Sequence, residues 1–208
     1  MKIALINASP KPSHSGSGNL MKCLKEDFPK DSFVKCFELH KKAISDEVLS
    51  ELLSMDTWVV LTPLYVDALP SHLLSCLVQI ENAKPTKKTR VYGVINCGFY
   101  EGIQTETGFD VLENFCTRCG FCFCGGMGIG GGGLLSTVPY LENKKHPKIG
   151  VLIKFKGFAR KIAKAKEYPI VYTHTNMPRP MYKVGAEVTW RVTAMKNGNA
   201  PWSLNKKY

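Results

Sequence analysis

The fold is decided by residues 2–20, which have the sequence KIALINASPKPSHSGSGNL. Residues 3–6 are a short apolar run, which predicts a buried strand in a parallel sheet. Serine, proline and glycine then dominate residues 9–18, which predicts a loop. Apolar residues next recur at helical spacing until Pro29, so we expect a helix after the loop.

This strand, loop and helix together predict a site for an anion. Free backbone N–H groups and the positive end of the helix dipole point toward one place, and a phosphate is the simplest occupant. Residues 17–19 lack the lysine of the ATP and GTP loop, and Ala8 and Pro10 replace glycines of the dinucleotide fingerprint. Two interpretations remain: a hydroxyl-rich site for one terminal phosphate, with Lys11 as a nearby charge, and an ordinary connection between strand and helix.

Apolar strands and amphipathic helices alternate along the next hundred residues. Further strands are expected at residues 33–39, 58–61, 91–95 and 121–124, with helices between them. This alternation predicts right-handed βαβ units and an α/β fold with a doubly wound parallel sheet, for which we expect five strands in the order 2-1-3-4-5. Residues 125–133 follow as a glycine run, which we expect to pack closely against its neighbours.

Three loops are expected at the carboxyl edge of this sheet, at the switch point where ligands bind in such folds. They are the first loop, residues 62–67 (TPLYVD) and residues 96–101 (NCGFYE). Tyr65, Phe99 and Tyr100 offer aromatic faces there. A planar ring with polar edges that carries one phosphate would match all three loops, and FMN fits that description. The alternative is that Tyr65 and Phe99 only close the edge of the core.

The same segments resemble the NAD(P)H-dependent FMN reductases of the flavodoxin-like superfamily. The resemblance rests on NASPKPSHSGSGN, TPLYVDALPSHL, NCGFYE and the glycine run GGMGIGGGG, and it covers about residues 1–135. It implies a flavodoxin-like fold, FMN as cofactor, NAD(P)H as reductant, a quinone, flavin or nitro-type electron acceptor, and a homodimer. One departure is Ala8, where the family usually has glycine; alanine is tolerated there if its φ is negative.

The resemblance also implies which residues hold the cofactor. Its phosphate contacts fall on Ser9, Lys11, Ser15, Ser17, Gly18 and Asn19. Its ring contacts fall on Pro63, Leu64, Tyr65, Val66, Asn96, Gly98, Phe99 and Tyr100. Because the cofactor performs the chemistry, we expect no catalytic side chain and no metal ligand. Two other classes are kept: a flavodoxin-like electron carrier without substrate turnover of its own, and a basic protein that binds anionic surfaces and retains a vestigial flavin site.

Four of the eight cysteines lie close together, at Cys116, Cys119, Cys122 and Cys124. Iron–sulfur and zinc sites use similar spacings. Here the first pair is expected at the end of a helix and the second pair on one face of a strand, so a single metal ion would require both elements to bend around it. We therefore expect buried free thiols, with an iron–sulfur flavoprotein as the alternative.

The positive charge of the chain is concentrated near its end. The 208 residues have a net charge of +11, but residues 1–141 carry 13 Lys+Arg and 14 Asp+Glu, whereas residues 142–208 carry 15 and 3. A polar connector at 139–147 precedes an amphipathic basic helix at 149–166, and a second helix is expected at 181–196.

We divide the chain into a flavodoxin-like FMN-binding core, residues 1–135, and a basic, mainly helical extension, residues 136–208, packed on the same domain or on a dimer partner. The extension is either a solvated face or a positive surface that attracts an anionic substrate such as NADPH. Since no nucleic-acid-reading motif accompanies the charge, we expect no nucleic-acid partner.

The sequence also bounds the location of the protein. No apolar run is long enough to span a bilayer, and Met1-Lys2 leads directly into a strand, so we expect neither a membrane span nor a signal peptide. Eight cysteines without a secretory signal predict a reducing, cytoplasmic environment.

Overall fold

The computed structural model describes residues 1–135, 149–175 and 177–205. The connector expected at 139–147 lies outside the described residues. The chain forms two compact units, Met1–Thr175 and Asn176–Tyr208. The first unit contains the sheet, and it is the unit that carries the candidate site.

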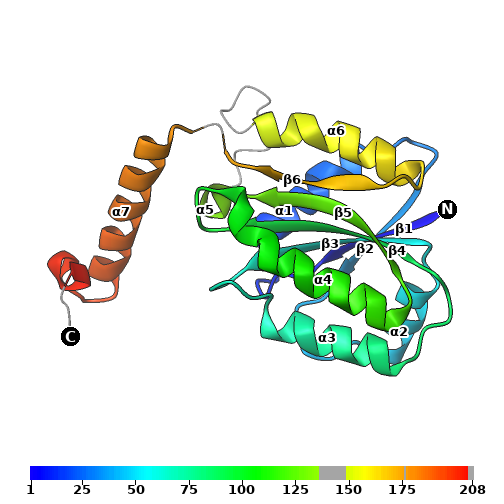
Figure 1. Ribbon diagram of the computed structural model, residues 1–208. Helices are drawn as coiled ribbons and strands as arrows, with labels where there is room; N and C mark the ends of the chain where they lie inside the picture. Colours follow the sequence, from blue (N-terminus) through cyan, green and yellow to red (C-terminus); the bar gives the residue numbers. More distant parts are fainter. Residues whose placement is uncertain (136–148, 176, 206–208) are drawn as a thin grey trace. The chain divides into compact units, whose positions relative to one another are not determined.

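The sheet of the first unit has six parallel strands in the order β2-β1-β3-β4-β5-β6 (Figure 1). The strands are β1 (Lys2–Asn7), β2 (Phe33–Glu38), β3 (Thr57–Leu64), β4 (Arg90–Cys97), β5 (Cys122–Ile129) and β6 (Tyr168–Thr173). The expected order 2-1-3-4-5 is therefore confirmed, and the expected count of five is wrong by one strand.

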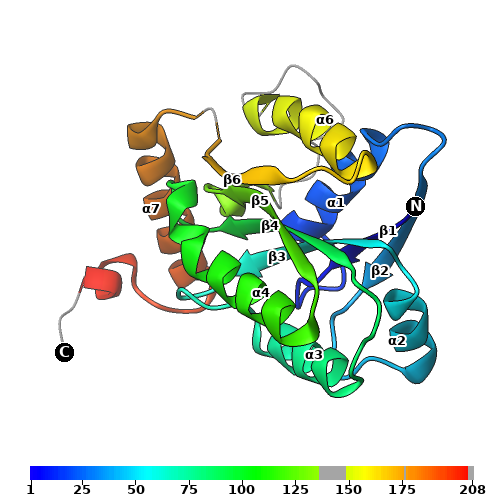
Figure 2. The same ribbon diagram turned by 45° about the vertical axis from the view of Figure 1, so that its right-hand side comes forward.

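Helices cover both faces of the sheet, as in a doubly wound fold. Figures 1 and 2 show α1 (Gly16–Glu26) and α6 (Ile149–Ala163) on one face. The other face carries α2 (Asp46–Leu53), α3 (Ser71–Asn82) and α4 (Glu106–Cys119). Two short helices follow the carboxyl ends of strands: η1 (Gly102–Thr105) after β4 and α5 (Gly132–Leu135) after β5.

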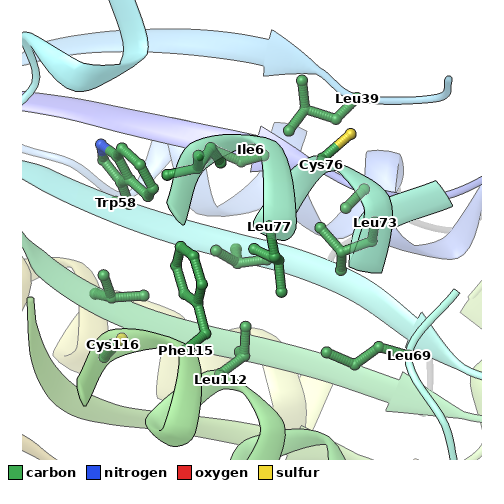
Figure 3. Close-up of a cluster of buried hydrophobic side chains, with 14 of the residues drawn as sticks. Ile6, Leu39, Trp58, Leu69, Leu73, Cys76, Leu77, Leu112, Phe115 and Cys116 are labelled. Carbon is green, nitrogen blue, oxygen red and sulfur yellow. The ribbon is translucent and has the colours of Figure 1, made fainter. Parts of the chain in front are cut away.

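The core beneath α2, α3 and α4 is built around aromatic contacts (Figure 3). Trp58 on β3 is 1% exposed and packs edge-to-face on Phe121, with ring centroids 5.1 Å apart. Its indole N–H donates to the carbonyl of Leu52 at 3.0 Å, so the one polar atom of this large side chain is paired. Burial of such side chains, at about 25 cal/mol per Å² of apolar surface, stabilises this layer.

The core on the opposite face includes the basic helix α6. Phe155, Phe158 and Ile162 of α6 are fully buried, while Lys154 and Arg160 are exposed. Phe158 packs edge-to-face on Tyr92 of β4 at 5.9 Å between ring centroids. The apolar stripe of α6 therefore packs on the sheet.

The sixth strand was not expected because it contains a proline. Pro169 follows the basic helix expected at 149–166, and it is the second residue of β6. Proline cannot donate to a strand ladder and is confined to edge strands or strand ends. Since β6 is the edge strand of the sheet and pairs only with β5, it tolerates Pro169.

The glycine run continues β5 and is not a loop throughout. β5 was expected to end at Cys124 but extends to Ile129. A Cβ on Gly126 would lie 2.1 Å from the carbonyl oxygen of Gly93, and one on Gly125, whose φ is +94°, would lie 1.6 Å from that of Tyr168. Only glycine allows the neighbouring strands to approach this closely, which confirms the close packing expected of the run.

The second unit consists of α7 (Arg179–Lys196) and η3 (Pro201–Asn205). The guanidinium of Arg191 donates to the carbonyl of Pro201 at 3.5 Å and pairs with Glu187 one turn earlier at 3.3 Å. Among the described residues, no helix combines the length and the apolar character needed to cross a bilayer.

Candidate functional site

Three neighbouring strands bring the predicted site segments to one edge of the sheet. β1, β3 and β4 are adjacent and parallel, with Asn7 opposite Leu61 and Leu64 opposite Cys97. α1 and α3, which follow β1 and β3, pack on opposite faces of the sheet. The loops after β1 and β3 therefore diverge, and this divergence is the switch point at which ligands bind in doubly wound folds.

The loop after β1 ends in a well-formed helix N-cap. Ser15 has extended backbone angles, and its hydroxyl accepts a hydrogen bond from the N–H of Gly18 at 3.0 Å. A Cβ on Gly18 would lie 2.8 Å from that hydroxyl oxygen, so a larger residue there would displace the Ser15 cap. The first turn of α1 contains no acidic residue, so the protein supplies no carboxylate there to offset the positive end of the helix.

A polar network lies beneath this loop. Ser9 is buried, and its N–H donates to the Asn7 side chain at 3.2 Å, while the Asn7 amide donates to Glu38 at 2.7 Å. His40 bridges the same groups: its Nδ1 donates to the carbonyl of Ser9 at 2.6 Å, and its Nε2 lies 3.0 Å from Glu38. Glu38 and His40 stand at the end of β2, which sequence reasoning did not connect with the first loop.

Ser17 and Asn96 join two of the predicted segments directly. Both side chains are buried, and the Ser17 hydroxyl donates to Asn96 Oδ1 at 2.9 Å. Asn19 is also buried, and its amide donates to the carbonyl of Leu135 at 3.0 Å. The start of α1, the end of β4 and α5 are thereby held together at the carboxyl edge.

The segment after β3 is a tight turn with two aligned hydrogen bonds. Tyr65 and Ala68 exchange backbone hydrogen bonds of 2.9 and 3.1 Å, and the residues between them, Val66 and Asp67, have φ of 48° and 60°. Pro63 and Leu64, which were expected in a loop, are the buried last residues of β3. Tyr65 is 47% exposed, so its ring projects from the edge of the core.

The segment after β4 presents a second exposed ring. Phe99 is 53% exposed, and the surroundings of Gly98 have room for a side chain. Since Tyr65 and Phe99 each remain about half exposed, neither closes the core. Burial raises the pKa of the neighbouring Cys97 thiol, so Cys97 is not an activated nucleophile.

Tyr100 reaches a residue that the sequence did not single out. It stacks on His174, just after β6, with ring centroids 4.8 Å apart and an interplanar angle of 27°. Nδ1 of His174 donates to the carbonyl of Thr175 at 2.7 Å. Because β6 was missed, no sequence signal connected residue 174 with this edge of the sheet.

Ala8 and the remaining phosphate-loop residue, Lys11, fit the expected arrangement. Ala8 is not among the described non-glycine residues with positive φ. The condition under which alanine is tolerated at this position, a negative φ, is therefore met. Lys11 is exposed, and its N–H donates to the Ser9 hydroxyl at 3.3 Å.

The four cysteines are divided between the two faces of the sheet. Cys116 and Cys119 belong to the core under α3 and α4, whereas Cys122 and Cys124 belong to the core under α6. Within the part of the chain that the structure describes, no three His, Cys, Asp or Glu side chains are grouped as metal ligands. Burial raises the pKa of Cys119 and of Cys124 to about 11, which favours the protonated thiols.

Comparison with protein-family models gives no match, and comparison with curated proteins gives none either. Solved structures do match. An NADPH-quinone reductase from P. pentosaceus has a TM-score of 0.56 at 15% identity and covers 76% of this chain and 98% of its own. An NAD(P)H:quinone oxidoreductase from Methanothermobacter marburgensis has a TM-score of 0.56 at 15% identity, with 78% and 96% covered. An azoreductase from Bacillus anthracis has a TM-score of 0.53 at 15% identity, with 79% and 99% covered. The chain therefore shares the fold of these structures, an α/β parallel sheet with helices that fits the flavodoxin-like class, with six strands and not the five expected.

Proposed function

We propose that the protein is an oxidoreductase that binds FMN at the carboxyl edge of its sheet, takes hydride from NAD(P)H and reduces a quinone, flavin or nitro-type acceptor. The observation that carries the proposal is the capped start of α1 at the same sheet edge as two exposed aromatic rings, Tyr65 and Phe99, which follow the adjacent strands β3 and β4. The similar solved structures support it, since they are named as quinone reductases and an azoreductase.

The residues present suit FMN. Hydroxyls and N–H groups at the start of α1 would hold one phosphate, since a helix N-terminus offers unpaired N–H groups and a positive dipole end. The residues assigned to the phosphate are Ser9, Lys11, Ser15, Ser17, Gly18 and Asn19, and those assigned to the ring are Pro63, Leu64, Tyr65, Val66, Asn96, Gly98, Phe99 and Tyr100.

Each part of the edge has its own task. FMN, when bound, supplies the hydride chemistry. The Ser17–Asn96 hydrogen bond fixes the phosphate loop relative to β4, and the hydrogen-bonded turn at Tyr65 fixes one aromatic wall. Because Tyr65 and Phe99 are exposed, the edge stays open on at least one side for a second substrate, which a homodimer partner could complete. The proposal includes an FMN-binding core at 1–135, an extension at 136–208 whose α6 and β6 pack on that core, and a cytoplasmic location.

Turnover distinguishes this proposal from its alternatives. Purified protein loaded with FMN is mixed anaerobically with NADPH or NADH and a small quinone, and absorbance of the nicotinamide is followed. We expect multiple turnovers that require both FMN and quinone. Reduction of bound flavin only by an added reductase would indicate an electron carrier, and iron in stoichiometric amount in the same preparation would indicate an iron–sulfur flavoprotein. A colourless protein that takes up no flavin would leave only the basic, surface-binding class.

A further inference from the structure

Cys122 and Cys124 form a close pair of thiols at the start of β5. They are the first and third residues of the strand and face the same side of the sheet, toward α6. Their sulfur atoms lie 3.8 Å apart, and the Cys124 thiol donates to the carbonyl of Cys122 at 3.4 Å. Both are free thiols.

The backbone at this place is compatible with a bond between the two sulfurs. Residues two apart on a strand have Cα atoms separated by roughly 6.6 Å, at the upper limit of the range of about 4.4–6.8 Å found for disulfides, so bond formation must draw the two Cβ atoms together. The pairing of β5 with β4 shifts register between Val91 and Gly93, and Gly125 directly after the pair has a φ of +94°. This bulge bends the strand locally, so the two thiols can approach without breaking the rest of the ladder.

The pair opens into a cavity at the amino edge of the sheet, far along the strands from the candidate FMN edge. The cavity has a volume of about 470 Å³ and is lined by Lys88, Arg90, Cys122, Cys124, Ala165 and Glu167. Cys122 is half-buried, whereas Cys124 is 4% exposed. Lys88 and Arg90 are exposed cations that outnumber the one carboxylate of the lining, Glu167, and attract anionic reagents. Cys122 is therefore the accessible sulfur and Cys124 the second one.

We propose that Cys122 and Cys124 are a redox-active dithiol that anionic low-molecular-weight disulfides oxidise to an intramolecular disulfide. The Cys122 thiolate attacks one sulfur of the reagent, the reagent's S–S bond breaks, and the first thiol leaves with the proton that Cys122 lost. Cys124 then loses its proton as its sulfur attacks the Cys122 sulfur, the mixed disulfide breaks, and the second thiol leaves with that proton. Two electrons pass from the protein to the reagent, and a reducing thiol reverses both steps.

Mass spectrometry of the whole protein tests the proposal directly. Reduced protein is incubated with oxidised glutathione, remaining thiols are blocked, and the protein is analysed intact and after digestion. We expect the loss of two hydrogens and a peptide in which Cys122 and Cys124 are joined, both reversed by dithiothreitol. A stable glutathione adduct on Cys122 without ring closure, or a disulfide at other cysteines only, would overturn the proposal.

Single-residue variants test the roles of Cys122 and Cys124 separately, so the test does not depend on the folding of any one variant. Cys124→Ser should stop at the glutathione adduct on Cys122. Cys122→Ser should react at least about tenfold more slowly at this pair, because only the buried sulfur of Cys124 remains. The control Cys36→Ser, on β2, should behave as wild type. Oxidised glutathione should react several-fold faster than neutral bis(2-hydroxyethyl) disulfide at low salt, and Arg90→Gln should reduce that advantage. Equal rates for the two disulfides would contradict the preference for anionic reagents.

Discussion

At the scale of single residues, the candidate site contains a strained backbone position. Val66 has a φ of 48° and is 94% exposed, so its side chain gains little by burial to offset the conformation. A left-handed conformation costs an L-residue roughly 1–2 kcal/mol, and a β-branched residue adopts it rarely. The strain is retained at the turn that presents Tyr65, which suits a functional position.

We expect Val66→Asn to raise the free energy of unfolding by about 1 kcal/mol, because asparagine tolerates positive φ and suits this position in a turn. Chemical denaturation measures the change. The matched control is Val78→Asn on α3, where Val78 is 55% exposed. Valine and asparagine have similar helix propensities, so the control should change stability by less than about 0.5 kcal/mol. A loss of stability in Val66→Asn would show that the turn is not strained at this residue.

Ser17 tests the phosphate loop at the same scale. Ser17→Asp would place a negative charge beside the bound phosphate, and we expect FMN affinity to fall at least about tenfold, or 1.4 kcal/mol. Ser13→Asp adds the same charge at an exposed position of the same loop and should change affinity much less. Because Ser17 is buried, the melting temperature of the flavin-free variant is measured as well, and Lys11→Gln, at an exposed position, should weaken FMN without altering the fold. Unchanged FMN affinity in Ser17→Asp and in Lys11→Gln would show that the phosphate binds elsewhere.

At the scale of elements, α6 and β6 show that the basic part of the chain contributes to the core. Phe158 of α6 contacts Tyr92 of β4 and lies 4.7 Å, between ring centroids, from Tyr168 of β6. The Tyr92 hydroxyl donates to the carbonyl of Lys166 at 2.7 Å, in the connection between the two elements. These contacts join the sixth strand and its helix to the central strands.

We expect Phe158→Ala to lower the free energy of unfolding by about 3–5 kcal/mol, since the ring is fully buried and leaves a cavity. Phe33→Ala at the start of β2 removes a ring that is 54% exposed and should cost no more than about 1 kcal/mol. Urea unfolding of both variants gives the comparison. Similar losses of stability in Phe158→Ala and Phe33→Ala would show that α6 does not belong to the core of this unit.

The elements also show what the sequence could and could not predict. The apolar runs of β1, β3 and β4 predicted buried central strands because such strands have hydrophobic residues on both faces. β6 was missed because Pro169 is compatible with a strand only at the edge, and edge position is a property of the assembled sheet. The glycines of β5 likewise have low strand propensity. The backbones of Tyr168 and Gly93 explain Gly125 and Gly126, and the side chains of Thr105 and Tyr172 explain Gly128.

The candidate site, like the sheet, could be predicted only in part from the sequence. The serines, prolines and glycines of residues 9–18 predicted a loop before a helix, and the side-chain hydroxyl of Ser15 caps that helix. The hydrogen bond between Ser17 and Asn96 joins residues 79 positions apart, and the stack of Tyr100 on His174 depends on the unexpected strand. Such contacts follow from the order of strands in the sheet and from no local pattern.

At the scale of the whole molecule, charge is distributed unevenly. Residues 142–208 carry 15 Lys+Arg against 3 Asp+Glu, and α6, which belongs to this segment, exposes Lys154, Lys156 and Arg160 while burying its apolar side. A positive surface of this kind attracts anionic substrates over distances set by the ionic strength.

We expect kcat/KM for NADPH to fall more steeply than that for NADH as salt is raised, because the 2′-phosphate adds charge to NADPH. Steady-state rates between low and high ionic strength, at saturating FMN and acceptor, measure the two slopes. NADH serves as the internal control, since it shares every other group with NADPH. Parallel salt dependences of kcat/KM for NADPH and NADH would show that the basic segment is a solvated face without a role in substrate capture.

The measurement that tests the account most directly is a titration of the purified, flavin-free protein with FMN, followed by flavin fluorescence and by melting temperature. The account predicts one FMN per chain, much weaker binding of FAD because we propose that the first loop holds a single terminal phosphate, and a stabilisation of about 2.7 kcal/mol at a free FMN concentration of about 100 times Kd. An unchanged melting temperature and unchanged fluorescence at saturating FMN would contradict the central claim that this edge of the sheet is a flavin site.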